Sequence, residues 1–112
     1  MTQADSPEEA VFRSMLEQAD NFGKCVELAN HVSNSQKEQA LKKALGLANH
    51  YDEAIYVNMA SSDPELQKQA ITKAISVTND SLHLNFWITR APTDELRALA
   101  KAKLKKLKRE KV

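Results

Sequence analysis

Apolar and small residues recur along the chain in blocks with a helical period, and polar clusters separate the blocks. One stripe follows the 3.6-residue spacing of an α-helix through Phe22, Cys25, Val26, Ala29 and Val32. Three further stripes are Ala40, Leu41, Ala44, Leu45 and Ala48; Leu66, Ala70, Ile71, Ala74 and Ile75; and Leu96, Leu99, Ala100, Leu104 and Leu107. The pattern predicts an all-α protein.

Helix start signals and polar breaks set the expected bounds of about seven helices. Ser33 and Gln36 have the spacing of a capping box, and Pro64 directly follows Asp63 at another helix start. The expected helices cover approximately residues 7–19, 22–32, 34–49, 52–60, 64–78, 82–90 and 94 into the C-terminal tail.

The composition agrees with helices. The 112 residues include only two glycines and three prolines, and aromatic residues make up 5% of them, which disfavours strands. Apolar residues at 42% and charged residues at 28% are typical of a globular chain. We expect residues 1–112 to form a single α-helical repeat domain, with residues 1–5 a disordered N-terminus and residues 108–112 a frayed basic tail.

A shift of 30 residues brings the chain into register with itself. Small or apolar residues then share positions on the longer helices: Ala10, Ala40, Ala70 and Ala100; Val11, Leu41 and Ile71; Met15, Leu45 and Ile75. The caps Ser33, Asp63 and Thr93 coincide, and Val26, Tyr56 and Phe86 coincide on the shorter helices. We therefore predict a short solenoid of about three helix pairs plus a leading helix, because one pair alone cannot bury its apolar face. The alternative is an irregular helical bundle whose alanines match by chance.

Two segments resemble short HEAT-like (armadillo-type) helical repeats. They run from Ser62-Asp63-Pro64-Glu65 to Ile71 and from Thr93-Asp94-Glu95-Leu96 to Ala100. The resemblance implies a curved, right-handed solenoid that is used for binding, and it implies no particular partner.

The same register aligns four basic residues, Arg13, Lys43, Lys73 and Lys103. If the repeats stack, these side chains line one edge at regular intervals and form a basic ridge for an acidic partner. The alternative is a solvated helix face on which Glu9 and Arg13 form a local i,i+4 pair.

Charge is unevenly distributed. Residues 1–100 hold nine Lys/Arg and fourteen Asp/Glu, a balance of −5, whereas residues 101–112 hold seven Lys/Arg and one Glu, a balance of +6. A lysine-rich tail can bind nucleic acid, or it can simply complement the dipole of a helix C-terminus. The acidic body opposes long-range attraction to DNA.

No arrangement typical of catalysis is found in the sequence. Cys25 falls on an apolar stripe, His83 stands alone, and His31 and His50 are expected at helix ends. No histidine pair has metal-finger spacing, and the two glycines exclude a phosphate loop. Trp87, Phe86 and Tyr56 are expected to face inward and pack between adjacent helices, and the alternative is an aromatic hot spot for binding. We therefore expect no enzyme activity, no catalytic residue, no metal and no cofactor.

These observations favour a non-enzymatic protein–protein interaction module, an adapter or regulator that binds an acidic partner through Arg13, Lys43, Lys73 and Lys103. The partner is expected to be another protein or a second copy of the chain. The alternative is a small nucleic-acid-binding protein that uses the basic ridge and the lysine-rich tail. With one cysteine, no signal-peptide pattern and no apolar stretch of membrane-spanning length, we expect a cytoplasmic protein without membrane attachment.

Overall fold

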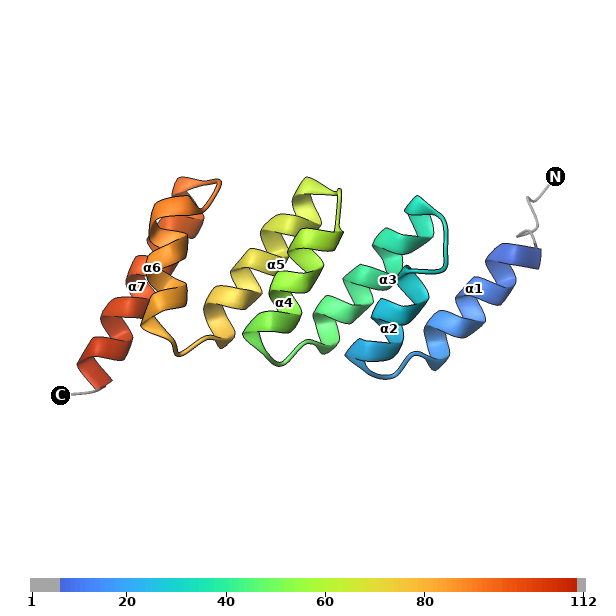
Figure 1. Cartoon of the computed structure of the whole chain (residues 1–112), viewed down its shortest axis with the longest axis horizontal. Helices are drawn as coiled ribbons and strands as arrows, with labels where there is room; N and C mark the ends of the chain where they lie inside the picture. Colours follow the sequence, from blue (N-terminus) through green and yellow to red (C-terminus); the bar gives the residue numbers. More distant parts are fainter. Residues whose placement is uncertain (1–6, 111–112) are drawn as a thin grey trace. The chain divides into compact units, whose positions relative to one another are not determined.

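The computed structural model describes residues 7–110, which form an all-α structure of seven helices and no strand (Figure 1). The helices are α1 (Pro7–Gln18), α2 (Phe22–Ala29), α3 (Asn34–Leu47), α4 (Tyr51–Ala60), α5 (Pro64–Val77), α6 (Ser81–Arg90) and α7 (Asp94–Glu110). The expected all-α class and the order of short and long helices are confirmed.

Some helix bounds differ from the sequence expectation. Helix α2 ends at Ala29 instead of near Val32, and α3 ends at Leu47 instead of near Asn49. Residues 108–110, expected to fray, are the last residues of α7. The expected disordered residues 1–5 and the last two residues of the tail lie outside the described part of the chain.

Side-chain caps start the later helices. Asp63 Oδ1 accepts a hydrogen bond from the Glu65 amide at 3.0 Å, with Pro64 in the first turn of α5. Thr93 Oγ1 accepts one from the Leu96 amide at 3.2 Å. Ser33 occupies the N-cap position of α3, but its side chain makes no capping hydrogen bond, so the predicted capping box with Gln36 is wrong. Helix α3 therefore begins where the sequence predicts, although the predicted side-chain hydrogen bond is absent.

The chain divides into two compact units, the first ending at Ala48 and the second beginning at Asn49. In the first unit α2 packs along α3, and α1 makes a smaller contact with α2. Its buried apolar residues are Phe12, Ala19, Cys25, Leu28, Ala29, Ala40, Leu41, Ala44, Leu45 and Ala48.

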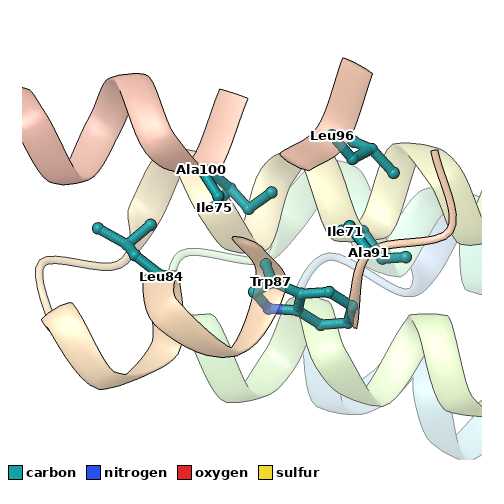
Figure 2. Close-up of a cluster of buried hydrophobic side chains, with 7 residues drawn as sticks. All are labelled: Ile71, Ile75, Leu84, Trp87, Ala91, Leu96 and Ala100. Carbon is teal, nitrogen blue, oxygen red and sulfur yellow. The ribbon is translucent and has the colours of Figure 1, made fainter. Parts of the chain in front are cut away.

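In the second unit α4 packs on α5, α6 packs on α7, and α5 also contacts α7. Figure 2 shows the buried apolar cluster of this unit, against which Tyr51 and Ile55 of α4 pack: Ile71, Ile75, Leu84, Trp87, Ala91, Leu96 and Ala100. The central members come from α5, α6 and α7. Burial of this apolar surface is the main force that holds the second unit together.

The 30-residue register reappears in the burial of the long helices. Ala40, Ala70 and Ala100 are each 0% exposed. Residues 41–50 and 71–80 alternate between buried, half-buried and exposed in the same order, position by position. Equivalent positions of α3 and α5 therefore have equivalent environments, as a repeat requires.

Helix α1 does not follow this register. Val11 is 58% and Met15 49% exposed, and Ala10 is also exposed, whereas Phe12 is 6% exposed. The expected buried face of the first helix is therefore wrong. The cause is a shorter spacing between helix starts: the N-caps of α2 and α3, Asn21 and Ser33, are one residue closer than the corresponding N-caps of the later pairs. A shift of 29 residues aligns Phe12 with Leu41.

The aromatic residues of the short helices do not lie together in the core. Trp87 is 7% exposed, as predicted, but Tyr56 is 38% and Phe86 46% exposed, so the inward placement expected for these two is wrong. Phe86 is two residues beyond Leu84, which is 0% exposed. Two residues turn an α-helix by about 200°, so a side chain at that position faces away from the core.

Candidate interaction site

Two of the four predicted ridge residues, Lys43 and Lys103, donate hydrogen bonds to backbone carbonyls. Lys43 Nζ, on α3, donates a hydrogen bond to the Leu16 carbonyl in the last turn of α1. Lys103 Nζ, on α7, donates one to the Ser76 carbonyl at 2.5 Å, in the last turn of α5. The last carbonyls of a helix lack partners within the helix and carry partial negative charge. Both lysines therefore stabilise the C-terminal end of the preceding long helix.

The other two ridge residues differ from each other. Lys73 is half-buried on α5, like Lys43 on α3, whereas Arg13 is exposed on α1. In the 29-residue register of α1, Ser14 and not Arg13 corresponds to Lys43. Arg13 and Lys43 belong to the first unit, and Lys73 and Lys103 to the second. Ligand binding by the four residues stays a prediction.

A different basic surface lies on α7, about 100° around the helix from its buried stripe of Leu96 and Ala100. We call it the α7 basic face: the exposed residues Arg97, Lys101, Lys105 and Lys108, spaced by three or four residues along one side of the helix. Arg97 Nη1 lies 3.6 Å from Asp94 Oδ1 and its Nε donates to the Ala91 carbonyl. Lys101, Lys105 and Lys108 make no hydrogen bond or ion pair within residues 7–110.

A shift of 30 residues compares these lysines with the equivalent positions of α5. Lys101 and Lys105 stand where α5 has Ile71 and Ile75, which are 4% and 1% exposed in the apolar cluster. On the adjacent short helix, Asn85 stands where α4 has Ile55. Burying an uncompensated lysine is costly. The outer side of the α6–α7 pair is therefore suited to water or to a polyanion, and it is unsuited to a further helix pair of the same kind.

A group of polar ring side chains ties α6 to α4. Trp87 Nε1 donates a hydrogen bond to Tyr51 Oη at 2.8 Å, and the rings of Tyr51 and His83 stack at 3.7 Å. Thr78 Oγ1 lies 2.7 Å from His83 Nδ1. Burial raises the pKa of Tyr51, and the hydrogen bond from Trp87 partly offsets it. The sequence suggested that His83 stands alone, but in the structure it contacts Tyr51 and Thr78. These contacts help to hold α6 against α4.

Cys25 is 0% exposed, and its Sγ donates to the Ala19 carbonyl at 3.5 Å. Burial raises the pKa of the thiol, which keeps it protonated and unreactive at neutral pH. Within residues 7–110, no group of three or more His, Cys, Asp or Glu side chains could hold a metal ion.

The second unit also carries an open groove of about 700 Å³. Its lining includes the buried residues Ile71 and Trp87 and the exposed residues Pro64 and Pro92. Lys68, another lining residue, forms an ion pair with Glu95 at 3.6 Å, which joins α5 to α7. In the part of the chain that the structure describes, no helix is both long and apolar enough to cross a membrane.

Comparisons of the chain with known protein families, with curated proteins and with solved structures give no match. The resemblance to HEAT-like repeats therefore rests on the two segments that begin at Ser62 and Thr93. The α7 basic face was not identified from the sequence, although the signal was present: the same 30-residue shift that aligns the alanines sets Lys101 and Lys105 against Ile71 and Ile75.

Proposed function

We propose that the protein is a non-enzymatic interaction module, a short right-handed solenoid of HEAT-like helix pairs, that binds an acidic segment of a partner protein on the α7 basic face. The proposal rests on one observation: Lys101, Lys105 and Lys108 are exposed and unpaired within residues 7–110. The positions of α5 that correspond to Lys101 and Lys105 hold the buried residues Ile71 and Ile75. The ridge of Arg13, Lys43, Lys73 and Lys103 has weaker support, because Lys43 and Lys103 already donate to backbone carbonyls.

The spacing of the charges suits an acidic helix or extended acidic peptide. Side chains four residues apart on a helix are separated by about 6 Å along its axis, so carboxylates with the same spacing on a partner helix can meet them in register. Each exposed pair contributes about 0.2–1 kcal/mol, so the face recognises its partner through several pairs together and binds more weakly as salt rises.

An acidic protein segment fits better than nucleic acid because residues 1–100 carry a balance of −5, which repels an extended polyanion. A short peptide that covers only α7 avoids most of this repulsion. The buried thiol of Cys25, the only cysteine, suits a reducing compartment, and we propose the cytoplasm as the location.

The experiment compares two fluorescent probes by anisotropy: a glutamate-rich helical peptide and a single-stranded oligonucleotide of similar length. The variant Lys101→Glu/Lys105→Glu should bind the peptide about tenfold more weakly, since two attractive pairs become repulsive. The matched control Lys37→Glu/Lys42→Glu makes the same change of net charge on α3 and should bind nearly as well as the unchanged protein. Equal loss in both variants, or tighter binding of the oligonucleotide, would contradict the proposal.

A further inference from the structure

The outer sides of α4 and α6 carry exposed apolar side chains. Four residues form what we call the outer apolar face, and they are 38%, 78%, 74% and 46% exposed: Tyr56, Met59, Leu82 and Phe86. They lie on the sides of their helices opposite Ala54 and Leu84, which are both 0% exposed. Single exposed apolar residues are ordinary, but a group on two neighbouring short helices marks a contact surface.

The two helices present this face together. Helices α4 and α6 run in the same direction within the second unit (Figure 1). The hydrogen bond from Trp87 to Tyr51 and the stacking of Tyr51 on His83 fix one helix to the other. Tyr56 and Phe86 are 30 residues apart and occupy the same turn of their helices. The outer apolar face is therefore one surface.

Opposite charges stand at the two ends of this surface. Asp52 is exposed in the first turn of α4, and the Asp80 carboxylate caps the first turn of α6. Arg90 is exposed in the last turn of α6, and its guanidinium lies 5.6 Å from the centre of the Phe86 ring. The surface is thus acidic where the short helices begin, apolar in the middle and basic where α6 ends.

We infer that the outer apolar face binds a second copy of this chain through a two-fold axis, with the short helices antiparallel across the contact. Such an axis sets Leu82 and Phe86 of one protomer against the same residues of its partner. It also brings each Arg90 near the acidic start of the partner's short helices. A parallel arrangement would place like charges together. Self-complementarity of this kind is what an isologous interface requires.

The inference does not depend on the α7 basic face, which lies on another helix. Any other partner would need a surface that is basic, then apolar, then acidic, opposite the acidic, apolar and basic parts of this face. A second copy supplies that surface by symmetry. The contact is small, so we expect a reversible dimer that forms at high protein concentration.

Sedimentation equilibrium over a wide concentration range tests the inference. The apparent mass should rise from 12.5 kDa toward twice that value. Leu82→Glu/Phe86→Glu should remain monomeric, because it places four carboxylates in the contact. The matched control Val11→Glu/Met15→Glu changes an exposed apolar i,i+4 pair on α1 and should still dimerise. Circular dichroism of both variants checks that they are folded.

A charge exchange tests the antiparallel geometry. Arg90→Asp should weaken the dimer, and Asp52→Arg/Arg90→Asp should restore it, since the pair is then reversed and intact. The inference is overturned if the unchanged protein remains monomeric at the highest concentration. It is also overturned if the α1 control dissociates as fully as the α6 variant, or if the exchange fails to restore the dimer.

Discussion

The sharpest test of the second unit compares two leucines on one helix. Leu84 and Leu82 are both on α6, but Leu84 is 0% exposed in the cluster of Figure 2 and Leu82 is 74% exposed. Leu84→Ala removes three carbons from a closely packed environment, whereas Leu82→Ala removes the same atoms from contact with water. The pair therefore separates burial from side-chain chemistry.

The expected magnitudes differ several-fold. Loss of three buried carbons costs about 2.4 kcal/mol at about 0.8 kcal/mol each. Incomplete collapse of the cavity adds to this cost, so we expect Leu84→Ala to lower the free energy of unfolding by about 3–4 kcal/mol, within the usual range for buried leucines. Leu82→Ala should change it by about 0.5 kcal/mol or less, because alanine is a strong helix former and little surface is buried.

Urea titration followed by the fluorescence of Trp87, the only tryptophan, reports on this unit. The midpoint should move to much lower urea for Leu84→Ala and stay almost unchanged for Leu82→Ala. Equal midpoints for the two variants would refute the assignment of inner and outer sides to α6.

Three further outcomes follow from individual contacts. Thr93→Ala should destabilise the second unit by about 1 kcal/mol, because it removes the cap on the Leu96 amide, and thermal melting measures the change. Because burial raises the pKa of Tyr51 above its ordinary value of 10.0, its neutral form favours the folded state. This stabilisation is present below about pH 10 and is lost as the pH rises through the raised pKa. Urea titrations at alkaline pH should therefore show a smaller loss of stability for Tyr51→Phe than for the unchanged protein. Cys25 should react with a thiol reagent only as fast as the first unit opens, so rapid reaction of the native protein would contradict its burial.

Much of the secondary structure could be predicted because its signals are local. Asp63 before Pro64 and Thr93 before Asp94 mark helix starts in the sequence, and both residues cap helices in the structure. The recurrence of Ala40, Ala70 and Ala100 predicted positions where helices approach closely, because only a small side chain fits there. All three alanines are fully buried in the structure.

The side that each helix buries was harder to predict. The 30-residue shift was also applied to α1, which precedes the α2–α3 hairpin. This hairpin is one residue shorter than its equivalents, so the shift fails for α1. Ala10 then matched Ala40 although alanine suits an exposed helix position equally well. The repeat register suggested a core position for Tyr56 and Phe86, whereas each lies two residues beyond a fully buried residue, Ala54 or Leu84, and is exposed.

The partners of long cationic side chains could not be predicted from the sequence. Lys43 and Lys103 reach carbonyls 27 residues earlier in the chain, and periodicity alone does not distinguish such a contact from solvent. The α7 basic face was detectable in principle, since it appears when Lys101 and Lys105 are compared with Ile71 and Ile75.

The short solenoid that we propose requires equivalent helix pairs to stack at equal steps, and distances between equivalent residues test this proposal most directly. Lys42, Thr72 and Ala102 are exposed and stand 30 residues apart on α3, α5 and α7. Spin labels on pairs of cysteines at these sites, in a Cys25→Ala background, give the separations. Adjacent packed helices lie about 10 Å apart, so a regular stack predicts equal 42–72 and 72–102 separations and a 42–102 separation of about twice that length. Unequal steps, or a broad 42–102 distribution, would contradict the repeat architecture.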